Sequence, residues 1–137
     1  MRNSFRMILA TAALAGAASL QTANADVVVI VSAKSTASTM TADQIAQIYL
    51  GKSTQMKPMD SGDTPTRSQF YTKVAGKDAA QIKAIWSKLV FTGKATPPQE
   101  LPTSADVVKA VASNPDSVGY VDRAAVDSSV KVVYEIK

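Results

Sequence analysis

The chain has 137 residues, with 15 Lys and Arg, 11 Asp and Glu, a formal net charge of +4 and neither cysteine nor histidine. These absences exclude thiol nucleophiles, Ser-His-Asp triads, disulfide frameworks and nearly every zinc site, and with them most hydrolase chemistry. The charge is weak and evenly scattered, which argues against a nucleic-acid partner and against an anionic membrane surface.

The first 25 residues have the pattern of a signal peptide. Arg2 and Arg6 form a short basic start, an alanine-rich apolar run follows over residues 7–20, and residues 23–25 read Ala-Asn-Ala, a typical cleavage site. An uncleaved anchor is the alternative, but the run is short for a membrane span, which needs roughly 18 apolar residues. We therefore expect export to the periplasm, cleavage after residue 25, and one domain over residues 26–137 with a formal charge of +2 once the two leader arginines are removed.

The N-terminal part of this domain predicts a strand followed by a helix. Residues 27–31 are five consecutive β-branched residues, a pattern typical of a strand buried on both faces. Thr41 and Gln44 form a capping box that begins a helix, and Gly51 is expected to end it.

The middle of the chain predicts two further helices. A short strand over residues 57–59 is expected to lead into a hydroxyl-rich loop over residues 61–70, after which a helix begins and is closed by Gly76 in a left-handed cap. Asp78 is expected to cap the longest helix. The apolar stripe of that helix is expected to anchor the core, since each buried side chain contributes about 1.5–3 kcal/mol; it consists of Ile82, Ile85, Trp86 and Leu89.

The C-terminal part predicts one more helix and two strands. Thr103 or Ser104 is expected to cap the helix, which ends before Pro115. Strands follow over residues 118–121 and 130–136, the second with alternating side chains. Strands at both ends with helices between them predict an α/β domain, a small mixed sheet flanked by about four helices.

The loop over residues 61–70 is where the sequence indicates chemistry. Hydroxyl groups, free backbone N–H groups at a helix start and a guanidinium are the groups from which proteins assemble an oxyanion site. The alternative is an ordinary helix start, with Thr64 or Thr66 as the N-cap and Arg67 solvated. The candidate anion-binding residues are Ser61, Gly62, Thr64, Thr66, Arg67 and Ser68.

The remaining polar and aromatic residues are expected to be structural. Asp60 and Asp63 could form a carboxylate pair but are expected to make Asx turns. Trp86 and Tyr120 are expected in the core, with the Tyr120 hydroxyl finding a partner at the rim. No catalytic residue, metal site or cofactor is predicted, and an enzyme is the least favoured class.

Three motifs occur in a characteristic order along the chain. They are residues 48–52, Ile-Tyr-Leu-Gly-Lys; residues 91–98, Phe-Thr-Gly-Lys-Ala-Thr-Pro-Pro; and residues 115–121, which end in Val-Gly-Tyr-Val. In this order they resemble the periplasmic substrate-binding proteins of phosphate ABC transporters, over residues 27–132. The resemblance is to the second lobe of the two-lobed periplasmic-binding-protein fold. It implies a single-lobe binding protein for phosphate or a similar small oxyanion, linked to an ABC transporter.

The resemblance also implies where the ligand would bind, with two departures. In that family a Ser-Gly-Thr turn at a helix start binds phosphate, and an arginine stands about four residues earlier. Residues 64–66 match the turn best, so Pro65 replaces glycine and removes a donor, Asp60 stands near the arginine position, and Arg67 is the candidate substitute. Residues 61–62 offer a second match.

These departures leave a second function open. A lobe that kept the fold and lost the ligand would be an interaction protein that docks onto a transporter permease or another envelope partner. The family binds its ligand in a cleft between two lobes, and a single lobe supplies one wall of it. A homodimer is the way in which two such chains would rebuild the cleft.

Overall fold

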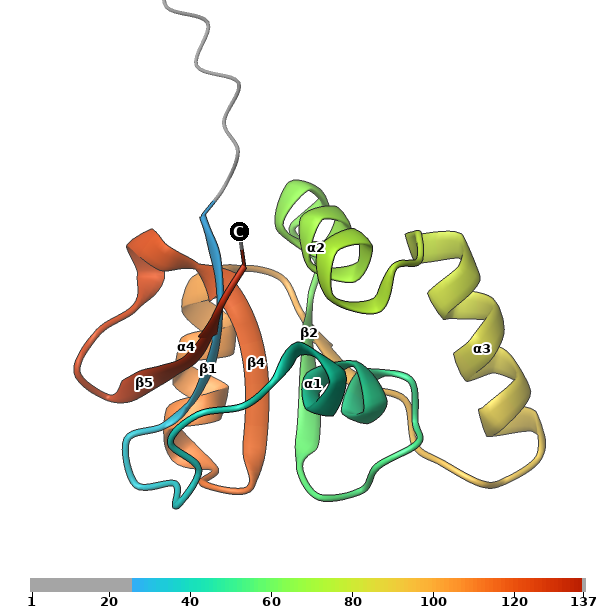
Figure 1. Ribbon diagram of the computed structural model, residues 1–137, viewed down its shortest axis with the longest axis horizontal. Helices are drawn as coiled ribbons and strands as arrows, with labels where there is room; N and C mark the ends of the chain where they lie inside the picture. Colours follow the sequence, from blue (N-terminus) through green and yellow to red (C-terminus); the bar gives the residue numbers. More distant parts are fainter. Residues whose placement is uncertain (1–25, 137) are drawn as a thin grey trace, which may run out of the picture.

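The computed structural model describes residues 26–136, and the expected signal peptide lies outside them. Five strands form one sheet in the order β3-β2-β4-β1-β5 (Figure 1). The strands are β1 (Val27–Ser32), β2 (Lys57–Ser61), β3 (Gln99–Leu101), β4 (Ser117–Asp122) and β5 (Val130–Glu135). The helices are α1 (Ala42–Tyr49), α2 (Thr64–Phe70), α3 (Ala79–Phe91) and α4 (Ser104–Ser113), with a π-helix η1 (Tyr71–Ala75) continuing α2 and a 3-10 helix η2 (Arg123–Ala125) after β4. No helix in this part of the chain is long and apolar enough to cross a membrane.

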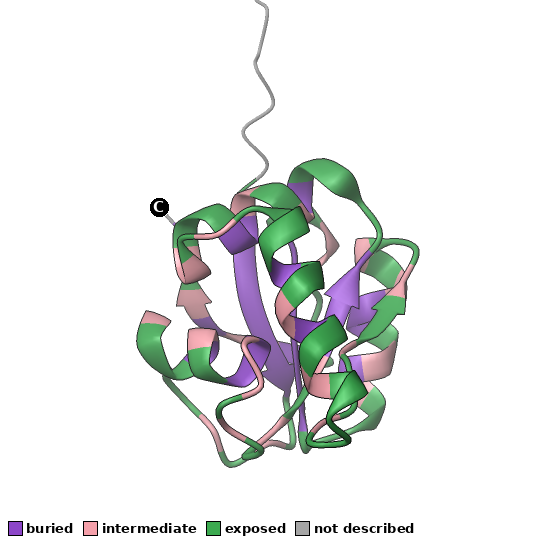
Figure 2. Ribbon diagram, turned by 90° about the vertical axis from the view of Figure 1, so that its right-hand side faces the viewer, coloured by how far each residue is buried: buried purple, intermediate pink, exposed green. Residues whose placement is uncertain are grey.

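The sheet is mixed and is covered on both faces. β1 pairs antiparallel with β4 and β5, whereas β2 pairs parallel with β3 and β4. The alternate side chains of β1 enter two separate apolar clusters, one with α4 and the other with α1, α2 and η1. Figure 2 shows the central strands buried and the outer surfaces of the helices exposed. The predicted doubly buried first strand and the predicted α/β class are confirmed.

Three of the helix starts predicted from local signals are found where expected. Thr41 and Asp78 form the capping boxes of α1 and α3, and Thr103 caps α4. Gly51 and Gly76 have φ angles of 75° and 64°, in the left-handed region that ends a helix at little cost for glycine.

The segment after β2 differs from the prediction. Most of the expected loop is helical, because α2 already begins at Thr64 with Pro65 in its first turn, where a missing N–H has no helical partner to lose. The N-cap is Asp63, so the expected caps at Thr64 or Thr66 are wrong.

The predicted apolar stripe of α3 joins the core, but only two of its four side chains are buried. Ile82 and Trp86 are buried, and the Trp86 Nε1–H donates to the Tyr49 carbonyl oxygen at 2.8 Å, so the prediction of a core tryptophan is confirmed. However, α3 lies at the end of the molecule remote from β5 (Figure 1), and Phe91 at its last turn is 93% exposed.

Two features of the sheet escaped the sequence patterns. β3 has only three residues, none of them buried, so it carries no apolar signal. In β5 the pairing with β1 shifts register between Val29 and Ile30. This bulge turns Val133 into the core beside α1, so the simple alternation expected for this strand is wrong.

Candidate functional site at Asp60 and Arg67

The site is built around Asp60 near the end of β2. In this strand Met59 faces α4, so the next side chain points to the opposite face, among the aromatic residues that α1, α2 and η1 bring there. The Asp60 residue is only 5% exposed. A carboxylate at this depth requires partners, because burying an unpaired charge is costly.

Three hydrogen bonds satisfy the Asp60 carboxylate. Oδ2 accepts from the Tyr71 hydroxyl at 2.8 Å, and Oδ1 accepts from the Tyr120 hydroxyl and from the Ser61 backbone N–H, the latter at 2.9 Å. The Ser61 N–H also lies 3.1 Å from the Tyr120 hydroxyl oxygen. We call Asp60, Ser61, Tyr71, Tyr120 and Arg67 the Asp60 cluster.

Aromatic packing holds the two hydroxyl groups in place. The rings of Phe70 and Tyr120 stack at 3.9 Å with an interplanar angle of 6°, and Tyr49 meets both rings edge-on. Burial raises the pKa of Tyr71 and the pKa of Tyr120 far above their ordinary value, and the negative charge of Asp60 raises both further. Both hydroxyl groups therefore remain protonated donors.

Arg67 lies on the outer side of the Asp60 cluster. Its Nη2 is 3.5 Å from Asp60 Oδ2 and its Nη1 is 3.8 Å from Glu100 Oε2, both longer than the roughly 2.7–2.9 Å of a charge-assisted hydrogen bond. The guanidinium carbon lies 5.9 Å from the centre of the Tyr71 ring. Nε is buried and has no hydrogen-bond partner among the described residues. Burial is the largest single effect and acts to lower the pKa of Arg67, but the interactions with Asp60, Tyr71, Tyr120 and Glu100 together outweigh it, so the pKa is raised.

These contacts correct two sequence interpretations. Arg67 is not fully solvated, because its side chain is 27% exposed and is paired with a buried acid. Asp60 and Asp63 do not form a carboxylate pair with shared partners. Asp60 lies in a strand rather than a turn, and Asp63 accepts a hydrogen bond from the Thr66 hydroxyl at the start of α2.

The other candidate anion-binding residues do not converge on one point. The Ser61 hydroxyl accepts from the Asp63 N–H at 3.2 Å, and the Gly62 N–H donates to the Leu101 carbonyl oxygen at 2.7 Å, so both groups are already paired within the fold. The Thr66 hydroxyl is likewise used at the helix cap. Thr64 and Ser68 are exposed. Of the six candidates, Ser61 through its backbone and Arg67 through its side chain belong to the Asp60 cluster.

Sequence reasoning missed Tyr71, Glu100 and the true partner of Tyr120. The Tyr120 hydroxyl was expected at the rim, but it donates to the most buried carboxylate of the site. One signal was available in the sequence. Asp60 directly follows the predicted strand over residues 57–59, and if that strand is longer than predicted, the Asp60 carboxylate is buried and needs hydrogen-bond donors. The sequence does not show which tyrosines supply those donors, because Tyr71 and Tyr120 lie 11 and 60 residues from Asp60 along the chain.

A hollow of about 620 Å³ opens beside Arg67, between α3 and the segment before β3. Its charged lining is Asp60, Arg67, Lys83 and Glu100, and α3 adds apolar side chains that include Val90 and Phe91. Within residues 26–136, no three acidic side chains are grouped so that they could hold a metal ion.

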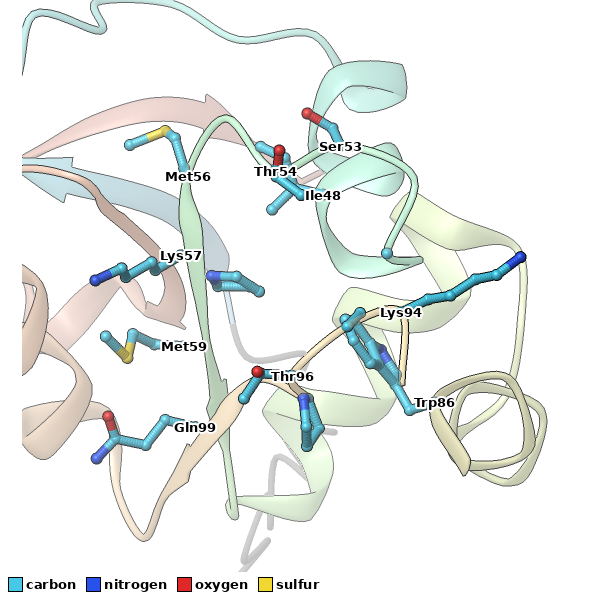
Figure 3. A pocket seen from close by; sticks show the side chains of 14 residues that line it. Ile48, Ser53, Thr54, Met56, Lys57, Met59, Trp86, Lys94, Thr96 and Gln99 are labelled. Carbon is cyan, nitrogen blue, oxygen red and sulfur yellow. The ribbon is translucent and has the colours of Figure 1, made fainter. Parts of the chain in front are cut away.

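A second hollow of about 400 Å³ lies on another side of Trp86, and Figure 3 shows the side chains that line it. Ile48, Met56 and Trp86 give it an apolar character. None of the six candidate anion-binding residues lines it, so the hollow beside Arg67 is the one that adjoins the predicted site.

Comparison with solved structures identifies the fold. The chain is similar to a phosphate ABC transporter substrate-binding protein with bound phosphate from Clostridium perfringens, with 23% identity, a TM-score of 0.64 and coverage of 79% of this chain and 44% of that one. It is also similar to an ABC-type phosphate transport receptor from Vibrio cholerae, with 16% identity, a TM-score of 0.61 and coverage of 79% and 45%. It is also similar to PstS from Borrelia burgdorferi, with 10% identity, a TM-score of 0.59 and coverage of 79% of this chain and 46% of that one.

The similarity confirms the expected periplasmic-binding-protein-like fold. The chain spans less than half the length of these three structures. No protein-family model and no curated protein matches the sequence.

Proposed function

We propose that this domain is a binding module for a small phosphate-like oxyanion, exported to the periplasm and working with an ABC transporter. The observation that carries the proposal is the state of Arg67. Its guanidinium borders the hollow, its ion pairs are long, and its Nε has no partner among residues 26–136. A planar guanidinium with unused donors is suited to bind an oxyanion. The fold, shared with a structure named for its bound phosphate, supports the same ligand class.

The charges around Arg67 set the expected strength of binding. Arg67 and Lys83 supply two positive charges to the hollow, whereas Asp60 and Glu100 supply two negative charges. The local balance is therefore neutral, and the Arg67 side chain is 27% exposed to water. We expect modest affinity that falls as salt is added, because the partly exposed charges are screened.

The second candidate is an interaction protein that keeps the fold and binds no small ligand. Two observations favour it: Asp60 pairs with the arginine that an anion would need, and Val90 and Phe91 are 49% and 93% exposed beside the same hollow. A transporter permease, another envelope protein or a second copy of the chain would be the partner.

Thermal melting of residues 26–137 with phosphate, sulfate and phosphonates at constant ionic strength separates the two candidates. An anion at 100 times its Kd should stabilise the native state by about 2.7 kcal/mol. Arg67→Lys keeps the charge opposite Asp60 but loses the planar fork, so the shift should be strongly reduced. Arg123→Lys is the matched control, because this exposed arginine pairs with Glu135 away from the hollow. If no anion gives a shift at millimolar concentration, oxyanion binding is rejected.

A further inference from the structure

The Asp60 carboxylate is surrounded as a bound oxyanion would be. Two hydroxyl groups and one backbone N–H donate to its two oxygens, and a guanidinium lies 3.5 Å from one of them. We infer that Asp60 is a built-in anion that fills an oxyanion cradle formed by Tyr71, Tyr120 and the Ser61 N–H. Asp60 is then the residue that excludes free oxyanions from this cradle and confines any ligand to the outer side of Arg67.

The three donors of the cradle come from three separate elements, and aromatic packing holds the two tyrosine rings. Ser61 belongs to β2, Tyr71 to η1 and Tyr120 to β4. The Tyr120 ring is stacked on Phe70 at 3.9 Å, and the Tyr71 ring packs edge-on to Phe70 at 5.2 Å. Because packing rather than the carboxylate orients both rings, the cradle should persist when the Asp60 side chain is removed.

The cradle has the chemistry to hold an anion. All three groups are donors, and both tyrosine hydroxyl groups are buried, where hydrogen bonds to a charged acceptor are stronger than in water. Neutral hydroxyl groups and N–H groups around a buried anion, with one guanidinium outside, form a complete donor set for a carboxylate-sized ligand. With Asp60 in place, a second anion entering the cradle would meet a carboxylate that already uses these donors.

Removal of the side chain and its replacement by a free anion tests this directly. Asp60→Gly deletes a methylene and a carboxylate, and acetate supplies the same group as a diffusible molecule. We expect the variant to melt below the wild type, and sodium acetate to raise its melting temperature with a saturable dependence on concentration. Sodium chloride at equal ionic strength and acetamide, the neutral analogue, should not do so.

Asp63→Gly is the matched control. It also removes a carboxylate with a hydroxyl partner near the start of α2, but Asp63 is exposed and leaves no enclosed cradle. Acetate should not raise its melting temperature. A folded Asp60→Gly variant that ignores acetate, or an equal response of Asp63→Gly, would overturn the inference.

A measurement on the wild type covers the case in which Asp60→Gly does not fold. In nitrogen-proton NMR spectra, an anion bound on the outer side of Arg67 leaves the hydrogen bond from the Ser61 N–H to Asp60 in place, so any shift of the Ser61 amide signal by acetate or phosphate should vanish in Arg67→Lys. A saturable shift of that signal that persists in Arg67→Lys would mean that free anions enter the cradle, and the inference would be wrong. If Asp60→Gly folds only when acetate is present, the inference is supported.

These outcomes are independent of the proposed function. Phosphate binding by the wild type through Arg67, together with no acetate response of Asp60→Gly, would retain the proposed function and reject the built-in anion. If acetate raises the melting temperature of Asp60→Gly but no anion raises that of the wild type, the built-in anion is supported and the proposed function is rejected.

Discussion

The two faces of the sheet are buried in different ways. On the α4 face, aliphatic side chains pack on one another, among them Val28, Ile30, Val107 and Val111. On the opposite face, four aromatic rings pack together, two of them donate hydrogen bonds from their hydroxyl groups to a buried carboxylate, and an arginine lies at its edge. The first face gives stability alone. The second face has groups that can bind, and its stability depends on charge and protonation.

Cutting a side chain from the aliphatic face should give the largest loss of stability. Ile30 is fully buried against α4, so Ile30→Ala should cost about 2–5 kcal/mol through lost burial and the cavity that remains. Urea unfolding would measure it. The loss should not change with acetate or phosphate, and any anion dependence would contradict the division between the two faces.

The aliphatic face is also too close-packed to accept extra volume. A Cβ at Gly119 would lie 2.6 Å from Val107 Cγ1 and 2.9 Å from Val111 Cγ2. Gly119→Ala should therefore destabilise by about 1–3 kcal/mol through overpacking. The same urea experiment applies. Gly93→Ala serves as a contrast for crowding, because nothing lies within 4 Å of its Cβ position and only its φ of 68° is strained.

On the aromatic face, loss of one hydroxyl group should cost nearly as much. Tyr120→Phe keeps the ring stack but leaves the buried Asp60 with one donor fewer, at a cost of about 1–3 kcal/mol. Tyr134→Phe is the control: Tyr134 is only half-buried, so a change within about 0.5 kcal/mol is expected. Equal losses of stability in the two variants would show that the hydrogen bond from Tyr120 to Asp60 does not stabilise the fold.

The smallest effect concerns pH. Tyr49, Tyr71 and Tyr120 have pKa values raised above the ordinary value of 10.0, so the folded state keeps protons that the unfolded state releases. The stability that these protonated tyrosines contribute is fully present below about pH 10 and is lost as the pH rises above that value. Stability should fall more steeply between about pH 9 and about pH 11 in the wild type than in Tyr71→Phe, as measured by urea unfolding. Parallel pH profiles would be the contrary result.

The same contrast explains what the sequence could predict. The capping box at Thr41, the Asp78 cap and the β-branched first strand are local signals, and all were found as expected. Motif order indicated the fold. The Asp60 cluster depends on where a strand ends and on hydroxyl groups that other elements bring, and no local pattern encodes that. The hydroxyl groups predicted as anion ligands, on Ser61 and Thr66, instead form hydrogen bonds with Asp63.

Calorimetric titration of residues 26–137 with phosphate, at low and high salt, tests the central claim that the aromatic face binds a small oxyanion through Arg67. The proposed function predicts a single saturable site that weakens with salt, is retained in Arg123→Lys and is nearly lost in Arg67→Lys. Absence of binding by the wild type, or equal binding by both variants, would contradict it.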